Sequence, residues 1–482
     1  MILIAIRARK NGPFILAALA CIIFIPLISA LLAINLIDGG LFSFHYAHSL
    51  FFVIAGILLL SIGRNYASTP IHSIGYIYIA VIAAYLFVPT VKFILDGYYW
   101  NPRSDTRLAA MMPSQNDQLE LLWYFIVYLI SFGFAYLLTT SSEPKEAPAL
   151  TVDNSMTSFF AVTFFVTLFV KYVVDIQLGV TGEYAQTSNT IAGQPLIVRQ
   201  LYQLLASVKY GAAVFALVLL GINYAKRRFL FYFILLILVL PPILSFGSRH
   251  EAVTFAFLAV VIYHLNYRAI SGRILLLLAI AALAVAFIVG TIRSFELGYA
   301  FDFSVSNEFE ATYGTFYDNL VNASAIPPEG IYYSDFVALI PQQFLPFEKV
   351  NSGYWYMSEY MAEAFAENIE SGYGFGVISE AAIGLGFIEL VIKGLIVGFI
   401  FGKMANYYNS GRGGVVFYCI YLFCLATCFR SFRASSFELL RSVPFALGPS
   451  IVLYMVVSRL NRLTKRSGSR GLNAAVVPSP LK

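Results

Sequence analysis

About twelve long apolar stretches constrain what this chain can fold into more than any other feature. Most of them run for about 17 residues or more, close to the length of helix that crosses the roughly 30 Å hydrocarbon core of a bilayer. Backbone polar groups in lipid must bond within the protein, and an uninterrupted apolar run does this as a helix. The composition agrees, since 59% of the residues are hydrophobic and 12% are charged. We therefore predict an all-α polytopic membrane protein with about twelve transmembrane helices.

The charges of the loops orient these helices. The expected spans lie near residues 13–36, 42–63, 71–95, 119–138, 159–178, 201–222, 230–246, 252–265, 274–292, 384–403, 415–429 and 439–458. Basic residues at 226–228, 268–273 and 403–412 fall in alternate loops, and both ends of the chain are basic as well. Because Lys and Arg are retained on the cytoplasmic side, both termini are predicted to be cytoplasmic.

This topology divides the chain into four parts. They are transmembrane helices 1–9 with short loops at 1–293, a large outward loop at 294–375, transmembrane helices 10–12 at 376–459, and a basic cytoplasmic tail at 460–482. The large loop holds twelve Asp or Glu, twenty aromatic residues and a single basic residue. Loops of this length usually carry function or short helices of their own. We expect such a helix at 358–368, where apolar and acidic residues alternate with helical spacing.

One aromatic run in the large loop is a candidate glycan-binding element. Tyr354, Trp355 and Tyr356 follow one another directly. Sugars stack their C–H faces on such rings, so these three residues are the predicted glycan contacts. The same residues also suit an aromatic belt at the membrane interface, and the pattern alone does not separate the two.

Six arginines stand at or near the outward ends of spans, where Lys and Arg are normally scarce. They are Arg199, Arg249, Arg293, Arg430, Arg433 and Arg441. A guanidinium in this position costs desolvation if it faces lipid. An anionic ligand at the outer membrane face would compensate that cost, and a lipid-linked diphosphate fits. We therefore predict that these six residues bind a diphosphate.

Arg249 has the strongest local context for an anion site. It follows Gly and Ser at 247–248 and is expected to open a helix. The free N–H groups and the dipole of a helix N-terminus add positive potential, and Arg binds phosphate oxygens in a bidentate fork. The alternative for Arg249 is pairing with Glu251 or with lipid headgroups. For Arg441 the alternative is an ion pair with Glu438 on the same helix.

Glu380 is the first candidate for a catalytic base. Three alternating glycines at 372–376 lead the chain to it at the outer interface. A carboxylate at that depth is costly unless it is paired, so the residue either acts in chemistry or pairs with a nearby arginine. Glu359 and His250 are the other candidates for the base.

Other polar residues inside the spans have structural interpretations. Glu389 with Lys393, and Lys171 with Asp175, have the i,i+4 spacing of salt bridges on one helix face. The cysteines lie in apolar spans without CxxC spacing and are expected to be small core residues. They are Cys21, Cys419, Cys424 and Cys428. No P-loop or dinucleotide-binding fingerprint is present, which argues against nucleotide-driven chemistry.

Three short segments, in this order along the chain, resemble the O-antigen polymerases, the oligosaccharide repeat-unit polymerases of the Wzy class. They are Gly-Ser-Arg-His at 247–250, Leu-Ile-Pro-Gln-Gln-Phe-Leu-Pro at 339–346, and the glycine-rich segment at 374–386 that includes Glu380. The resemblance implies a GT-C-like fold whose large loop is periplasmic, in the bacterial inner membrane. It also implies a metal-independent glycosyltransferase without a cofactor. The family's loop histidine has no counterpart here, because 294–375 contains no His.

The partners that this resemblance implies are undecaprenyl-diphosphate-linked glycans as donor and acceptor, membrane lipids and a chain-length regulator, with no nucleic acid. Two other functions remain open from the sequence. A membrane ligase shares the donor chemistry, and a flippase would handle the same lipid-linked sugars. Transporters concentrate polar residues near the midplane, whereas the unusual charges here gather at the outer interface.

Overall fold

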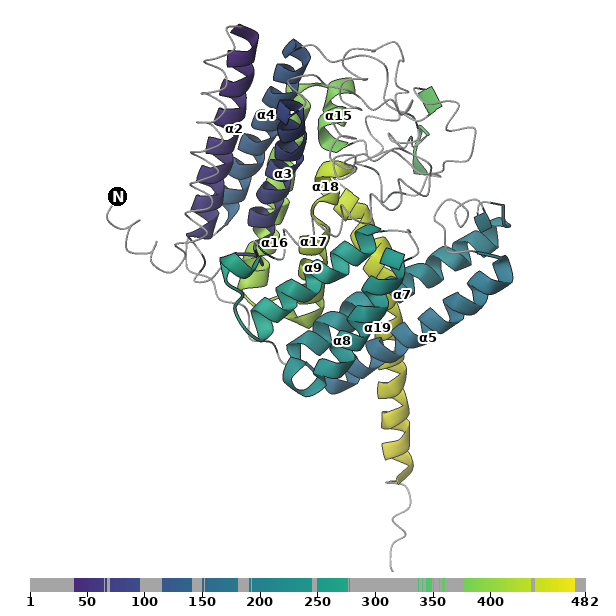
Figure 1. Cartoon of the computed structure of the whole chain (residues 1–482). Helices are drawn as coiled ribbons and strands as arrows, with labels where there is room; N and C mark the ends of the chain where they lie inside the picture. Colours follow the sequence, from purple (N-terminus) through teal and green to yellow (C-terminus); the bar gives the residue numbers. More distant parts are fainter. Residues whose placement is uncertain are drawn as a thin grey trace, which may run out of the picture.

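A computed structural model describes residues 39–64, 70–95, 115–140, 152–180, 193–244, 249–275, 376–434 and 438–472, with short stretches at 190–191, 344–348 and 358–359 and a few single positions between them. All regular elements in these ranges are helices (Figure 1). Five of them are long and apolar enough to cross a membrane, and three shorter helices are also apolar. The described part of the chain is therefore a helical membrane protein. The predicted span near 13–36, most of the one near 274–292, and nearly all of the large loop lie outside the described residues.

The helices follow the predicted spans closely. They are α2 (Gly39–Gly63), α3 (Ile74–Leu95), α4 (Gln115–Thr139), α5 (Asn154–Leu178), α7 (Leu196–Ile222), α8 (Tyr224–Leu244), α9 (Arg249–Asn266), α15 (Gly376–Ile383), α16 (Phe387–Asn409), α17 (Gly414–Thr427), α18 (Arg430–Arg433) and α19 (Glu438–Leu472). Every predicted span within the described ranges coincides with one of these helices. The short helices α15 and α18 were not predicted, and α19 continues into the segment that was predicted as a tail.

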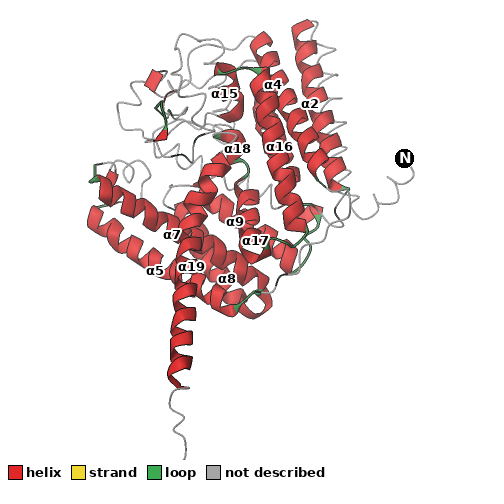
Figure 2. Cartoon of the chain, turned by 180° about the vertical axis from the view of Figure 1, so that it is seen from behind, coloured by secondary structure: helices red, strands yellow, loops and turns green. Residues whose placement is uncertain are grey.

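Two groups of helices make up the described bundle. In one group α4 contacts α2, α3 and α16, and in the other α7 contacts α5, α8, α9 and α19. The helix α17 contacts members of both groups and lies between them (Figure 1, Figure 2). Among the described helices, α17 and the short helix α18, which contacts α15 and α19, are therefore places where residues from both groups meet.

Glycines bring α16 and α4 into close contact. Gly394, Gly398 and Gly402 are spaced four residues apart on one face of α16. An added Cβ at Gly394 would lie 2.8 Å from Ser131 Cβ, and one at Gly398 would overlap the backbone oxygen of Phe132. Small residues at this spacing let membrane helices approach closely, which favours van der Waals packing over specific side-chain contacts. The helices α4 and α16 therefore pack closely over the segment from Gly394 to Gly402.

Two helices expose apolar surface to their surroundings. Only 17% of the apolar window of α5 and 11% of that of α19 are buried, against 67% for α4. Lipid would cover such faces without cost. The centre of the second group is α7 instead, where Gly211 allows α19 to approach and Ser450 Oγ donates a hydrogen bond to Val208 O at 2.9 Å.

Candidate functional site

The candidate site lies at the end of the bundle where α15 and α18 meet, which we call the α15 end. Glu380 belongs to α15, whose residues 376–381 are all buried. Gly376 opens this helix with φ 73°, a left-handed conformation that favours glycine. The predicted glycine-rich approach to Glu380 therefore has a physical reason, but Glu380 lies in a buried helix and not in a loop.

Glu380 forms a buried ion pair with a lysine. Lys393 Nζ lies 2.6 Å from Glu380 Oε2 and 2.7 Å from Glu389 Oε1. The side chains of Lys393 and Glu380 are 4% and 7% exposed, so neither charge has water as an alternative partner. The predicted Glu389–Lys393 pair is confirmed. The ion pair that the structure shows for Glu380 is with Lys393, whereas the alternative predicted from the sequence was an arginine.

The turn between α15 and α16 holds the third member of this triad. Glu389 lies in the first turn of α16, and its Oε2 accepts a hydrogen bond from the Leu385 backbone N–H at 3.0 Å. A carboxylate is stabilised at a helix N-terminus by the dipole and the free N–H groups. An added Cβ at Gly384 would overlap the Glu389 carboxylate, so a larger residue there would displace Glu389 from its present position. Gly386 adopts φ 59° in the same turn.

The helix α18 brings two of the predicted arginines to the same place. Phe432 is fully buried, and its ring centre lies 5.2 Å from that of Tyr85 and 6.0 Å from that of Tyr128. This anchor places Arg430 and Arg433 at the two ends of α18, both partly buried. The helices α18 and α15 contact each other (Figure 1). The helix that carries these two arginines therefore lies against the helix that carries Glu380, about fifty residues earlier in the chain.

Tyr128 connects the triad to α18. Its hydroxyl lies 2.7 Å from the hydroxyl of Tyr78, within a fully buried pair. Lys393 and Glu380 are both close enough to this phenol to interact with it electrostatically. The α4 helix thus supplies a neutral hydroxyl beside the buried ions.

A second group of polar residues on α7 and α9 reaches the same end. The charges of Glu251 and Arg430 both act on Tyr210, which also hydrogen-bonds to Thr254. Glu251 also acts on Lys209, the next residue along α7 toward its N-terminus. The first turn of α9 therefore lies near α18. The predicted residues Arg249 and His250 belong to this turn, but their side chains lie outside the described residues.

The predicted Lys171–Asp175 salt bridge is confirmed, and it contains a third residue. Lys171 Nζ donates to Asp175 Oδ2 at 2.6 Å and to Tyr202 Oη at 2.8 Å. Tyr202 donates in turn to Asp175 Oδ1 at 2.8 Å, so the three groups satisfy one another and join α5 to α7. This closed network fits the structural role predicted for the pair.

The remaining predicted residues are less well placed. Arg199 lies in the first turn of α7, partly exposed, and in the described part of the chain its Nε makes no hydrogen bond. The side chain of Trp355 is buried, and its backbone oxygen accepts a hydrogen bond from Ser358 Oγ at 2.8 Å. Glu359 is exposed. The backbone of Arg441 belongs to α19. The side chain of Arg441, together with Arg293, Tyr354 and Tyr356, lies outside the described residues.

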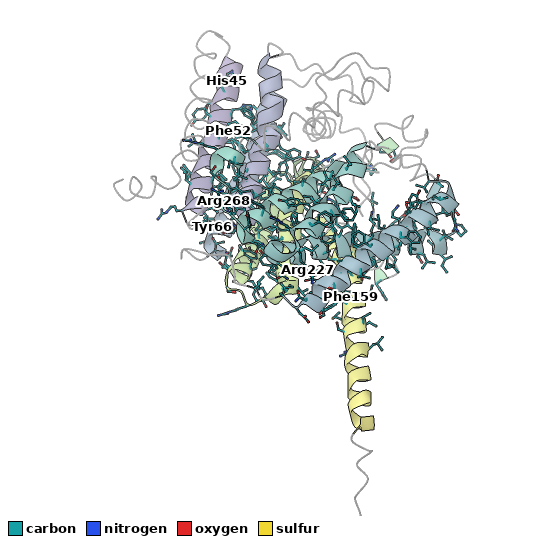
Figure 3. All side chains as sticks on the ribbon, turned by 60° about the horizontal axis from the view of Figure 1, so that its bottom comes forward. His45, Phe52, Tyr66, Phe159, Arg227 and Arg268 are labelled. Carbon is teal, nitrogen blue, oxygen red and sulfur yellow. The ribbon has the colours of Figure 1, made fainter. Side chains whose placement is uncertain are left out.

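The opposite end of the bundle, which we call the His72 end, was not predicted as a polar site. His72 is 4% exposed, and its ring lies edge-on to Tyr66 with centres 5.0 Å apart and 6.1 Å from the ring of His264. Burial, with the charge of His264 second, lowers the pKa of His72 to about 3, so the ring is neutral. Figure 3 shows Tyr66 and Arg268 from this end. No local pattern could have found this cluster, because its members come from distant segments.

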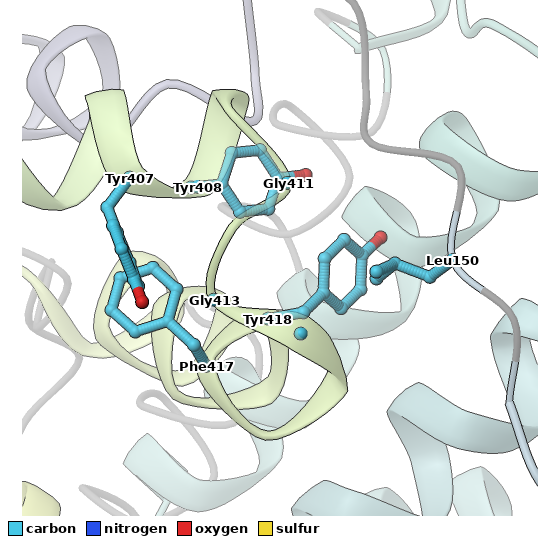
Figure 4. A pocket seen from close by; sticks show the side chains of 8 residues that line it. Leu150, Tyr407, Tyr408, Gly411, Gly413, Phe417 and Tyr418 are labelled. Atoms are coloured by element: carbon cyan, nitrogen blue, oxygen red, sulfur yellow. The ribbon is translucent and has the colours of Figure 1, made fainter.

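A small cavity near the turn between α16 and α17 lies away from the α15 end. Tyr407, Tyr408, Phe417 and Tyr418 surround it, with glycines of the turn (Figure 4). Its volume of about 10 Å³ has room for a single water molecule and not for a sugar. The aromatic rings here therefore pack against one another, as the stacked Tyr408 and Tyr421 rings do at 4.0 Å.

Cations at such a site can bind an anionic group, and a carboxylate beside them can accept a proton from a neighbouring hydroxyl. No family model matches the chain, and neither a curated protein nor a solved structure matches it.

Proposed function

We propose that this chain is a metal-independent membrane glycosyltransferase that polymerises undecaprenyl-diphosphate-linked oligosaccharide repeat units. In this proposal it adopts the twelve-span, GT-C-like arrangement with both termini cytoplasmic, and the α15 end faces the periplasm of a bacterial inner membrane. The observation that carries the proposal is the contact between α18, with Arg430 and Arg433, and α15, with Glu380. Glycosyl transfer from a lipid diphosphate requires a group that binds the anionic diphosphate and a carboxylate that accepts the proton of the acceptor hydroxyl.

Arginines hold the diphosphate of the donor. Arg430 and Arg433 bind its oxygens, with Arg249 from the first turn of α9 and Arg441 from α19. Negative charge develops on the diphosphate as the glycosidic bond breaks. Guanidiniums that are already in place stabilise that charge without a metal ion, and little reorganisation is needed during the reaction.

Glu380 is the base in this mechanism. The oxygen of an acceptor hydroxyl attacks the anomeric carbon and forms the new C–O bond. The bond from that carbon to the diphosphate oxygen breaks, and its electron pair leaves with undecaprenyl diphosphate. The hydroxyl proton passes to the Glu380 carboxylate. The acceptor lipid then carries a glycan that is longer by the transferred chain.

Reconstitution separates this proposal from its nearest alternatives. The purified protein in lipid vesicles is given an undecaprenyl-diphosphate-linked repeat unit, without nucleotide and with a chelator present. We expect a ladder of products that differ by one repeat unit. A single transfer to a different acceptor would identify a ligase, and movement of the intact substrate across the bilayer alone would identify a flippase. Either result would overturn the proposed polymerisation.

A further inference from the structure

Lys393 is ion-paired with two carboxylates in the buried triad. Its Nζ lies at nearly the same distance from both carboxylates, 2.6 Å from Glu380 and 2.7 Å from Glu389. Glu389 is also held independently, because its second oxygen accepts the Leu385 N–H. The two carboxylates therefore differ. Glu389 is fixed by the turn and by the N-terminus of α16, while Glu380 belongs to a separate helix.

We propose that Glu389 is a positioning residue that keeps Lys393 ion-paired while Glu380 takes up a proton. This inference rests on the proposed function, in which the proton comes from the acceptor hydroxyl. When the O–H bond of the acceptor breaks, its proton forms a new O–H bond on the Glu380 carboxylate, and Glu380 becomes neutral. Lys393 then remains paired with the Glu389 carboxylate, so that no buried ammonium is left without a counter-charge.

The physical reason is the cost of a single buried charge. A lysine that is 4% exposed cannot exchange its partner for water. If Glu380 were the only partner, protonating it would leave an uncompensated cation in the interior, which is strongly unfavourable. Glu380 would then be held as the anion and would be a poor base. A second carboxylate removes this penalty.

The groups that face Glu380 do not offer another explanation. From α16 they are Lys393 and Glu389. From α18 the described helices bring Arg430 and Arg433 near, and from α4 they bring the Tyr128 phenol and, beside Glu389, Tyr124 with Glu120. The guanidiniums keep their charge at all ordinary pH values, and phenols are neutral around pH 7. A proton that enters this group near neutral pH therefore goes to a carboxylate.

Two substitutions in the triad should move the protonation of Glu380 in opposite directions. Glu389→Gln keeps the shape and the acceptor for Leu385 N–H but removes one negative charge, so Lys393 acts on Glu380 alone. The pH at which Glu380 protonates should fall by roughly one unit. Lys393→Met leaves two neighbouring carboxylates without a cation, and the same midpoint should rise by roughly two units. Lys393→Arg keeps the charge and serves as the matched control.

Infrared difference spectra of the purified protein across a pH titration measure this directly. The buried protonated carboxyl gives a C=O stretching band, which Glu380→Gln assigns by removing it. Opposite displacements in the two variants support the inference. An unchanged or raised midpoint in Glu389→Gln overturns it, and that isosteric variant decides the matter even if Lys393→Met does not fold.

The same variants in the vesicle assay keep the inference separate from the proposed function. If the wild type yields a ladder, the acid limb of its rate profile should move downward in Glu389→Gln. If the wild type yields no ladder while the infrared midpoints move as stated, the triad has the inferred charge balance and the polymerase proposal is wrong. A ladder with an unmoved acid limb would show that Glu380 is not the base.

Discussion

The two ends of the α4–α16 pair are equally well buried but are built from different chemistry. At the α15 end, full charges meet in the Glu380–Lys393–Glu389 triad, with two arginines nearby. At the His72 end, every described contact is neutral, and Tyr421 Oη donates to His72 O at 2.8 Å while Ser73 Oγ and Tyr136 Oη share a hydrogen bond of 3.1 Å.

This difference indicates that the residues of the α15 end do more than stabilise the fold. Neutral hydrogen bonds and stacked rings are enough to close a bundle, as the His72 end demonstrates. Buried ion pairs add little net stability, because the cost of desolvating two charges offsets much of their attraction. A chain that buries charged side chains at one end, and no Lys, Arg, Asp or Glu among the described residues at the other, is therefore expected to use those charges. The predictions below test this asymmetry.

The largest effect is expected from Glu380→Gln. The substitution preserves size but removes the base, and general-base catalysis contributes roughly 10²–10⁴-fold to rates. Polymer formation in vesicles should fall by about that factor while the protein remains folded. Glu359→Gln tests the other glutamate that the sequence predicts as a base, and Glu348→Gln, at an exposed glutamate with no predicted role, is the matched control. A normal rate in Glu380→Gln, or an equal loss in Glu348→Gln, would remove the chemical role of the α15 end.

A smaller but clear effect is expected from Arg249→Ala. The loss of one cation aimed at a developing oxyanion costs roughly 10²–10³-fold. Cells with this variant should accumulate exported single repeat units and lack long polymer, as gel electrophoresis of the surface glycan would show. Arg268→Ala is the control, because Arg268 is exposed just beyond the other end of the same helix. Long polymer in the Arg249→Ala strain contradicts its place in the donor site.

The sequence predicts those interactions of this molecule that join residues close together along the chain, and it does not predict those between distant segments. The spans follow from apolar length, and the Glu389–Lys393 and Lys171–Asp175 pairs follow from one-turn spacing, because both are local properties of a helix. The Glu380–Lys393 pair joins residues 13 apart across a turn, and it went unpredicted because no periodicity reports a tertiary contact. The approach of α18 to α15 is hidden for the same reason.

The sequence also carries a signal for helix packing in α16. The glycines at 394, 398 and 402 predict a closely packed partner helix for α16. They do not say which helix it is, because α4 lies more than 250 residues away along the chain. Topology alone marks the arginines as unusual, but only the structure shows that α18, with Arg430 and Arg433, contacts α15, with Glu380.

The connection between the two ends can be weakened without touching either. Gly398→Ala places a Cβ against the Phe132 backbone oxygen, so α16 must move away from α4 at a cost of about 1–3 kcal/mol in the free energy of unfolding. Gly63→Ala at the end of α2 meets only ordinary contacts, with Pro70 and Tyr76 at 3.9 Å, and is the matched helical control. Thermal unfolding in detergent should show a lower melting temperature for the first variant only. Equal melting temperatures would refute the close α4–α16 contact.

The smallest effect concerns pH at the His72 end. His72 has its pKa lowered from 6.5 to about 3, so folding favours the neutral ring. Its contribution to stability is complete above about pH 6.5 and is lost progressively as the pH falls toward 3. The melting temperature of the wild type should therefore drop more steeply than that of His72→Phe between about pH 7 and pH 5. Parallel pH dependences in the two proteins would show that this ring does not need to be neutral.

A measurement of lipid diphosphate binding tests the central claim most directly, because the account has the arginines at the α15 end bind that diphosphate. Native mass spectrometry can compare undecaprenyl diphosphate with undecaprenol on the wild type and on a variant carrying both Arg430→Gln and Arg433→Gln. We predict that the wild type retains the diphosphate in preference to the alcohol and that the double variant loses this preference. Equal retention of the two lipids by the wild type, or an undiminished preference in the variant, would contradict the account.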